Sequence, residues 1–258
     1  MPVQYTALVL AGTRPGGDPL AEYAGVTHKA LIELGGQPML ARVLAALAAT
    51  PQVARIVVAI DRPEILAGLG PVGAPVEAMP AAAGPSASVA LALEREGTPL
   101  LVTTADHALL QAQWVTEFLH LAADAPADAV VGLARSEAVL AAAPGTQRTW
   151  LRFADGDYSG CNLFLLRTAE ASRIVQLWQT LEAARKRPMT LLRRLGLLQV
   201  LRYRLGLLGL TPALDRLGHI AGARLRHVVL TDGRAAIDVD KPSDLELARQ
   251  LLGAGPID

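Results

Sequence analysis

Short apolar runs that alternate with helical patterns constrain the fold of this chain more than any other feature. The runs Tyr5–Leu10, Arg55–Ile60 and Pro99–Thr104 have the length and apolar character of buried strands. Segments with apolar residues at helical spacing, such as Pro38–Ala49 and Ser86–Arg95, lie between them. Strands that alternate with helices favour a mixed, mainly parallel sheet with helices on both faces, which is an α/β fold.

The same patterns predict the remaining elements. The helix at Ser86–Arg95 is expected to start on a serine cap, and one short strand is expected near Val76 in a loop rich in Pro, Gly and Ala. Further strands are predicted at Asp128–Ala134, Trp150–Phe153, Asn162–Leu166, Arg226–Leu230 and Ala236–Val239. Further helices are predicted at Gln113–Leu121, Thr168–Arg187 and Pro242–Leu252, with more helix between Arg187 and about Leu217.

Length and composition limit the class of protein. A chain of 258 residues, of which 52% are hydrophobic, suits one large α/β domain over residues 1–258. Equal numbers of acidic and basic residues give no indication of a nucleic-acid partner. Cys161 is the only cysteine, so no intrachain disulfide forms and a buried, unreactive thiol is expected. With no signal peptide or spanning helix expected, the cytoplasm is the predicted compartment.

A glycine-rich loop follows the first strand. Gly12, Gly16 and Gly17 allow a tight turn and a close approach to a ligand. Backbone amides in such a loop can point at phosphate oxygens, and Arg14 and Lys29 add positive charge. The spacing fits neither a Walker A loop nor a dinucleotide fingerprint. A plain surface turn is the alternative interpretation.

Carboxylates stand at two further points where ligands are expected. Asp106 stands just past the strand Pro99–Thr104, and Asp238 and Asp240 lie two residues apart near the C-terminus. Carboxylates of this kind can hold Mg²⁺, which binds through one or two acids and phosphate oxygens. The alternative is structural, because Asp106 can cap a turn and Asp240 or Ser243 can cap the final helix.

These segments together resemble the MobA-like nucleotidyltransferases. The N-terminal stretch LVLAGTRPGGDP…HKALIELGGQPML is similar to the family pattern of a strand, a Leu-Ala-Gly loop, a lysine and a Gly-x-Pro closure. The C-terminal stretch DVDKPSDL is similar to the late acidic motif of the family. Thr13 stands where a second glycine is usual, Arg14 comes early, and the stretch from Gly17 to Lys29 is longer than usual.

The resemblance implies a Rossmann-like nucleotidyltransferase fold over most of the chain. It implies that the loop binds the phosphates of a nucleoside triphosphate, with Lys29 reaching back to them from beyond the loop. It also implies a metal at Asp106 with Asp238 or Asp240. The loop residues concerned are Leu10, Ala11, Gly12, Thr13, Arg14, Gly16 and Gly17.

Weaker similarities extend the expected site to the nucleoside and the acceptor. Ser86 and Ser88 lie in a segment similar to the one that contacts base and ribose in the family, although a serine cap explains them equally well. Asn162 lies in a small-residue turn similar to the one beside the acceptor, and local backbone contacts are its alternative. His107 is a further candidate for positioning the acceptor, with an ordinary turn residue as the alternative.

Residues 185–218 form a predicted helical insertion that the family pattern does not explain. The insertion holds eight Lys or Arg and one acid among many leucines, so it can lie on a membrane surface. We favour the alternative of a helical lid whose leucines pack on the sheet while its arginines stay in water. A lid that admits an acceptor with a lipid tail combines the two.

The expected activity is transfer of a nucleoside monophosphate from an NTP to a phosphorylated small-molecule or lipid-linked acceptor, with Mg²⁺ as cofactor. A glycosyltransferase with a related fold is one rival, weakened because Asp106 is not followed by a second acid at position 108. A non-catalytic nucleotide-binding protein is another rival, which the altered loop keeps open.

Overall fold

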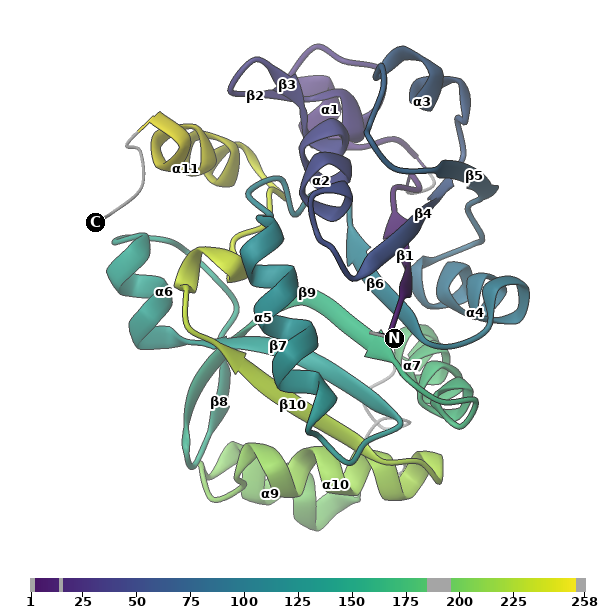
Figure 1. Cartoon of the computed structure of the whole chain (residues 1–258). Helices are drawn as coiled ribbons and strands as arrows, with labels where there is room; N and C mark the ends of the chain where they lie inside the picture. The colour runs from purple at the N-terminus through teal and green to yellow at the C-terminus, as the bar shows by residue number, and fades with distance from the viewer. Residues whose placement is uncertain (1–2, 14–15, 185–195, 254–258) are drawn as a thin grey trace.

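The computed structural model describes residues 3–13, 16–184 and 196–253, and it is built around one mixed sheet of eight strands (Figure 1). The strand order is β10-β7-β9-β6-β1-β4-β5, with β8 paired to β9. A separate two-stranded sheet pairs β2 (Glu33–Leu34) with β3 (Gln37–Pro38). The strands of the main sheet are β1 (Tyr5–Leu10), β4 (Val53–Ile60), β5 (Val76–Pro80), β6 (Leu100–Thr104), β7 (Ala129–Arg135), β8 (Leu151–Phe153), β9 (Gly156–Leu166) and β10 (Leu225–Leu230).

The sheet is mainly parallel, as the alternating pattern predicts. Strand β1 runs parallel to both β4 and β6, β4 to β5, and β10 to β7. Strand β9 runs antiparallel to β6, β7 and β8. The carboxyl ends of β1, β4 and β6 therefore meet at one edge, where ligands bind in sheets of this kind.

Helices cover both faces of the sheet. Ala7 and Val9 of β1 pack into a core that includes α2 and α5, whereas Leu8 faces a second core that includes α4 and α7. Burial on both faces explains why β1 is mostly apolar. The α-helices are α1 (Pro19–Tyr23), α2 (Met39–Ala48), α3 (Glu64–Gly68), α4 (Pro85–Glu96), α5 (Ala112–Ala123), α6 (Ser136–Ala142), α7 (Ala171–Ala184), α9 (Leu197–Arg204), α10 (Leu210–Ala221) and α11 (Pro242–Gly253), with 3-10 turns η1 (Lys29–Leu31) and η2 (Gly233–Ala236).

Two local predictions are wrong. Helix α4 begins after Gly84, which makes no side-chain capping bond, so a serine does not cap it. The predicted strand Ala236–Val239 is instead the end of η2 followed by irregular backbone. Its apolar residues are buried although no strand in the described part of the chain pairs with them. The amide of Val239 instead donates to the carbonyl of Asp106 over 3.0 Å.

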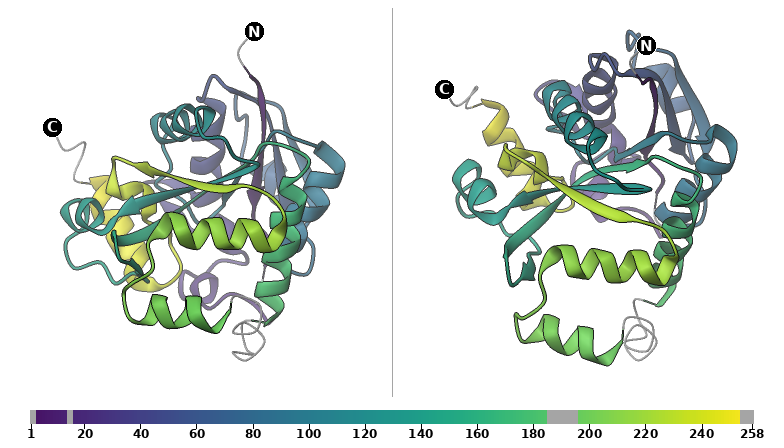
Figure 2. Two further views of the ribbon diagram at one scale, coloured as in Figure 1. Left: turned by 90° about the horizontal axis from the view of Figure 1, so that it is seen from below. Right: turned by 60° about the horizontal axis from the view of Figure 1, so that its bottom comes forward.

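The insertion divides into parts with different packing. Helix α10 runs alongside β10 (Figure 2), and Leu210 and Leu214 pack against Leu133 and Tyr158. Helix α9 lies on the outer side of α10. Residues 185–195, including the predicted continuation of α7 to Arg187, lie outside the described residues. Within the described part of the chain, no helix has the length and apolarity needed to cross a membrane.

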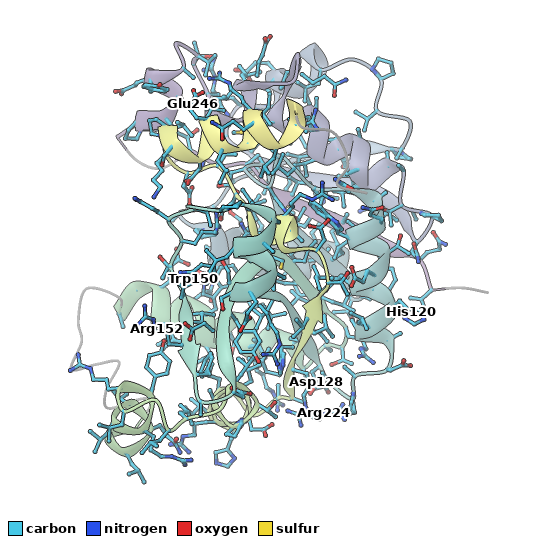
Figure 3. All side chains as sticks on the ribbon, turned by 90° about the vertical axis from the view of Figure 1, so that its left-hand side faces the viewer. His120, Asp128, Trp150, Arg152, Arg224 and Glu246 are labelled. Carbon is cyan, nitrogen blue, oxygen red and sulfur yellow. The ribbon has the colours of Figure 1, made fainter. Side chains whose placement is uncertain are left out.

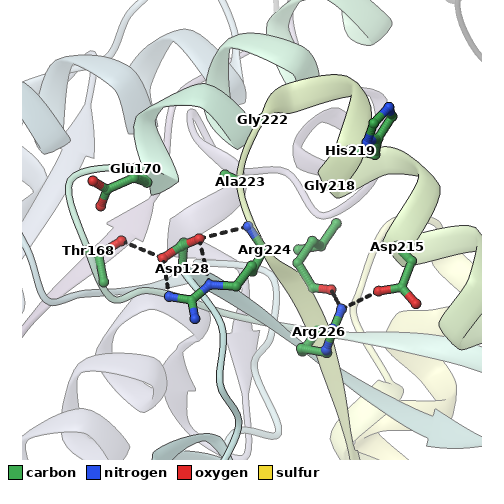
Figure 4. A pocket seen from close by; sticks show the side chains of 11 residues that line it. Asp128, Thr168, Glu170, Asp215, Gly218, His219, Gly222, Ala223, Arg224 and Arg226 are labelled. Atoms are coloured by element: carbon green, nitrogen blue, oxygen red, sulfur yellow. Dashed lines mark hydrogen bonds and ion pairs between the residues drawn. The ribbon is translucent and has the colours of Figure 1, made fainter.

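A charged network joins β7 and β10 at their amino ends. Asp128 accepts hydrogen bonds from the Arg224 amide over 2.7 Å, from the Arg224 guanidinium over 3.0 Å and from Thr168 over 3.0 Å. Asp128 and Arg224 lie far from α11, which carries Glu246 (Figure 3). A pocket of about 680 Å³ opens here (Figure 4), and its Asp215 is likewise paired with Arg226. Because these charges are paired internally, we assign this end of the sheet a structural role.

The network predicts a pH-dependent contribution to stability. Hydrogen bonds from Arg224 outweigh burial and lower the pKa of Asp128 from 3.8 to about 2. A depressed pKa stabilises the fold above the unfolded-state value, and this stabilisation is lost as pH falls through the folded-state value. We expect Asp128→Asn to lower the free energy of unfolding by about 1 to 2 kcal/mol at pH 7. The difference in free energy of unfolding between wild type and variant should shrink as the pH falls from about 4 towards 2. Urea unfolding across this range checks it, and a difference independent of pH would contradict it.

Candidate active site

Backbone hydrogen bonds fix the three segments in which the sequence predicts a site. The amide of Ala105 donates to the carbonyl of Leu10 over 2.9 Å, which ties the end of β6 to the end of β1. The amide of Val239 donates to the carbonyl of Asp106 over 3.0 Å, which holds the late acidic segment against β6. Residues far apart in the sequence thus meet at the carboxyl edge of the sheet.

Lys29 lies between two of the predicted carboxylates. Its Nζ is 2.9 Å from Oδ2 of Asp106 and 2.7 Å from Oδ1 of Asp240. The side chain of Lys29 is 18% exposed, that of Asp106 23% and that of Asp240 50%, so the cluster opens to solvent on the Asp240 side. The structure therefore brings together three residues that the sequence places in the site.

The charge of Lys29 is stabilised by its partners. Burial lowers the pKa of the ammonium, but the charges and hydrogen bonds of Asp106 and Asp240 outweigh burial, and the net pKa is raised. Lys29 therefore carries a positive charge at neutral pH. An ammonium held at a site of this kind can neutralise phosphate oxygens.

Two residues that the sequence analysis did not single out hold the backbone of Lys29. His28 caps η1, because its Nδ1 accepts a hydrogen bond from the amide of Ala30 over 3.1 Å. Since Nδ1 is the acceptor, Nε2 carries the hydrogen and faces Oδ1 of Asp61 at 3.3 Å. Asp61 directly follows β4, as Asp106 follows β6, and that repeated position is the sequence signal that could have revealed it.

The same carboxylate oxygen holds the glycine loop. Oδ1 of Asp61 accepts from the amide of Thr13 over 2.9 Å and from its hydroxyl over 3.2 Å. Burial raises the pKa of Asp61, but the hydrogen bonds from Thr13 and His28 outweigh burial and lower it overall. Thr13, the departure from the usual glycine, thus connects the loop to the residue before Lys29.

Glycine is favoured at each loop position for a different structural reason. A Cβ on Gly12 would lie 2.9 Å from the Cβ of Ala81, so the loop packs closely on the chain after β5. Gly16 and Gly17 have φ values of 96° and 89°, a region that favours glycine. Leu10 and Ala11 are fixed by sheet hydrogen bonds, whereas the predicted catalytic residue Arg14 lies outside the described residues.

Asp238 occupies a different environment from Asp240. One of its oxygens pairs with Arg148, and the other accepts from Nδ2 of Asn162 over 2.9 Å. Asn162 has a φ of 47°, which is uncommon for a residue other than glycine and marks a local constraint. The predicted acceptor residue Asn162 therefore lies beside Asp238. Arg148 was not predicted, because its loop has no distinguishing sequence pattern.

The predicted nucleoside contacts, Ser86 and Ser88, are engaged within the protein. Ser88 donates its hydroxyl to the carbonyl of Gly84 over 3.0 Å and accepts from the amide of Ala82 over 3.0 Å. The hydroxyl of Ser86 pairs with the carboxylate of Glu182 on α7. Both serines are buried. They lie at the start of α4, and their contact with a nucleoside stays a prediction.

His107, a predicted acceptor residue, lies in the core. The turn after β6 directs its ring inward, where it is 1% exposed and stacks on Trp114 with ring centroids 6.3 Å apart. Burial lowers the pKa of His107 to about 4, although the charge of Asp106 opposes the shift. Cys161 is also buried, and burial raises the pKa of its thiol, in agreement with the predicted unreactive cysteine.

The carboxylates fit the chemistry of a divalent cation in part. Oδ1 of Asp106 is buried and has no hydrogen-bond partner among the described residues. Carboxylates that share one cation, as Asp106 and Asp240 share Lys29, suit Mg²⁺, which keeps waters and shares phosphate oxygens. Within the described ranges, no group of three or more His, Cys, Asp or Glu residues forms a metal-binding cluster.

A comparison with family models decides the classification. The model of the MobA-like NTP transferase domain matches residues 7–206, which include Lys29, Asp106 and Asn162. The chain belongs to this family. It is therefore a MobA-like nucleotidyltransferase, although no curated protein sequence matches it.

Solved structures agree with this classification. A hypothetical transferase from Thermus thermophilus is 32% identical and has a TM-score of 0.80. The match covers 94% of this chain and 100% of the transferase. The 4-diphosphocytidyl-2C-methyl-D-erythritol synthase of Anaerococcus prevotii has a TM-score of 0.58 at 10% identity, with 97% and 96% of the two chains covered. A CMP:2-keto-3-deoxy-manno-octonic acid synthetase complexed with CTP has a TM-score of 0.58 at 16% identity, over 99% and 100% of the chains. The last two matches show a shared fold.

Asp61 is predicted to position the loop and Lys29 together. Asp61→Ala removes an acceptor of three hydrogen bonds, and we expect kcat/KM for the nucleotide to fall roughly tenfold to a hundredfold, equivalent to about 1 to 3 kcal/mol. Asp61→Asn keeps an acceptor oxygen and should lose less. Steady-state release of pyrophosphate measures both. Glu64→Ala, which removes an exposed carboxylate of the same region, is the control, and equal activity of Asp61→Ala and this control would contradict the role.

Proposed function

We propose that this nucleotidyltransferase transfers a nucleoside monophosphate from an NTP to a phosphorylated acceptor and releases pyrophosphate. The observation that carries the proposal is the contact of Lys29 with Asp106 and Asp240, beside a glycine loop that Asp61 ties to the same turn. This arrangement supports the proposal, because it combines a cation with two carboxylates at the carboxyl edge of the sheet, where ligands bind in folds of this kind.

The proposed reaction is an in-line substitution at the α-phosphorus. An oxygen of the acceptor phosphate forms a bond to the α-phosphorus, and the bond from that phosphorus to the bridging oxygen of pyrophosphate breaks. The acceptor phosphate is already anionic, so the reaction needs no strong general base. Catalysis then depends on positioning and on neutralising the charge of the leaving group. Lys29, Arg14 and the amides near Gly16 and Gly17 are the proposed ligands of the leaving phosphates.

Asp106 and Asp240 are the proposed ligands of Mg²⁺. Asp240 already shares a cation with Asp106, whereas both oxygens of Asp238 are engaged by Arg148 and Asn162. The contact with Lys29 that Asp240 shares with Asp106 favours Asp240 over Asp238 as the second ligand. When bound, the metal would supply positive charge to the α-phosphate. Asp238 is then proposed to orient Asn162 and Arg148 towards the acceptor.

Cytidine nucleotides are the first candidates for the donor. Two solved structures of the same fold are named for cytidine-containing products, and one of them is complexed with CTP. Ser86 and Ser88 remain the proposed contacts to base and ribose. The acceptor is proposed to be a phosphorylated small molecule or a lipid-linked phosphate.

Helix α9 supports a second, peripheral contact with a membrane. The predicted packing of leucines holds for α10 but not for α9, where Leu198 is 65% exposed and Leu201 48%, followed by Leu205 at 61%. Arg202 and Arg204 accompany them, and α9 contains no acid. Exposed leucines with arginines suit an anionic bilayer surface. Two copies paired through α9 would instead oppose like charges, so we propose the bilayer as the occupant.

The proposed reaction predicts that two single substitutions stop turnover. Asp106→Ala and Lys29→Ala should each lower pyrophosphate release at least about a thousandfold, because each removes charge stabilisation of the transition state. Candidate acceptors are supplied with CTP and Mg²⁺, and circular dichroism verifies folding. Lys241→Ala is the matched control, since Nζ of Lys241 donates to the carbonyl of Gln147 over 3.2 Å and not to the two carboxylates. Near-normal pyrophosphate release from either variant would exclude the mechanism.

The membrane contact predicts selective sedimentation. The protein should pellet with vesicles containing phosphatidylglycerol but not with phosphatidylcholine vesicles, and the triple variant Leu198→Ser, Leu201→Ser, Leu205→Ser should stay in the supernatant. Leu140→Ser, which replaces an exposed leucine on α6, is the control. Equal pelleting with both lipids, or unchanged pelleting of the triple variant, would remove this proposal.

A further inference from the structure

Lys29 occupies the position between the carboxylates that the proposed metal would use. Its Nζ contacts Oδ2 of Asp106 at 2.9 Å and Oδ1 of Asp240 at 2.7 Å. In the structure, the two carboxylates are therefore already paired with a cation. A divalent ion that approached the same oxygens would meet the repulsion of that ammonium at short range.

We propose that Lys29 and a divalent cation compete for Asp106 and Asp240, and that the triphosphate ends the competition by offering the ammonium new oxygen partners. This inference rests on the proposed function. It assigns Lys29 a role before catalysis, in which it keeps the carboxylates paired until nucleotide and metal arrive together. Afterwards the same side chain would neutralise the leaving phosphates.

The surroundings of Lys29 allow this exchange with side-chain motion alone. Its backbone is fixed, because His28 caps η1 and contacts Asp61. The four-carbon side chain beyond that backbone is flexible, and its ammonium is not part of the cap. Asp61 also binds Thr13, so the glycine loop lies next to the turn that carries Lys29. Phosphates held by that loop would give the ammonium an alternative to the carboxylates.

Only one of the two carboxylate oxygens of Asp106 contacts Lys29. Oδ2 contacts Lys29, while Oδ1 is buried and has no hydrogen-bond partner in the described part of the protein. Asp240 is half exposed, so a hydrated cation can reach the pair from solvent. Removal of the ammonium would take away a positive charge that both carboxylates contact. The inference therefore makes a prediction of unusual sign: loss of Lys29 should strengthen metal binding to the free enzyme while it abolishes turnover.

Binding of Mn²⁺ to the nucleotide-free protein tests the exchange. Free Mn²⁺ is measured by electron paramagnetic resonance during titration of wild type, Lys29→Met and Lys29→Arg. We expect Lys29→Met to bind Mn²⁺ at least about tenfold more tightly than wild type, which corresponds to about 1.4 kcal/mol. Lys29→Arg, which keeps the charge, should bind no more tightly than wild type. The gain should disappear in the double variant Lys29→Met, Asp106→Asn.

A second lysine tests whether the loss of any nearby positive charge changes the affinity for Mn²⁺. Lys241 follows Asp240 in sequence but its Nζ bonds the carbonyl of Gln147, so Lys241→Met removes a nearby charge that is not between the carboxylates. Its effect on Mn²⁺ affinity should be less than about threefold. Unchanged or weaker binding in folded Lys29→Met, or an equal gain in Lys241→Met, would overturn the exchange.

The outcome is separable from the proposed function. If Lys29→Met gains no affinity but wild type still releases pyrophosphate from NTP and acceptor, the exchange alone is wrong. If wild type neither binds nucleotide nor releases pyrophosphate, the proposed function is wrong, whatever the Mn²⁺ titration shows.

Discussion

The contact of one ammonium with two carboxylates is the interaction on which the site depends. Lys29 lies in a 3-10 turn after β1, Asp106 lies after β6, and Asp240 lies just before the final helix α11. Parallel pairing of β1 with β6 and one backbone bond from Val239 bring these segments together. The sheet therefore serves chiefly to place charges from three distant segments at one edge.

The two ends of the sheet serve different purposes. At the amino ends of β7 and β10, Asp128 and Arg224 satisfy each other, and the pocket beside them has paired charges. At the carboxyl ends, Oδ1 of Asp106 is buried without a partner and Asn162 has a constrained backbone. An unpartnered carboxylate oxygen and a constrained backbone at this end each call for an explanation beyond folding, and a ligand site provides one.

Much of this arrangement follows from local sequence patterns. Apolar runs such as Tyr5–Leu10 are typical of buried strands wherever they pair, and the positions of Lys29 and Asp106 after predicted elements indicate their shared edge. Ala236–Val239 is equally apolar but is not a strand, because tertiary packing and one backbone bond replace a neighbouring strand.

Long-range partners could not be predicted from those patterns. Asp61 contacts Thr13 across 48 residues, and Arg148 contacts Asp238 across 90, so neither pair has a periodic signal. His107 shows that closeness in sequence is also insufficient. Its neighbour Asp106 contacts Lys29, whereas the turn directs the imidazole of His107 into the core. In α9, the pattern of leucines and arginines is compatible with either a packed or an exposed face, and only the fold shows that the leucines are exposed.

The most direct test of the central claim is a thermal-shift titration with ATP, GTP, CTP and UTP, each with and without Mg²⁺. A ligand that binds the native state raises its melting temperature. The account predicts that at least one of the four raises the melting temperature of the wild-type protein, that the rise requires Mg²⁺, and that Asp106→Asn abolishes it. The absence of any shift with all four nucleotides, or a full shift in Asp106→Asn, would contradict the account.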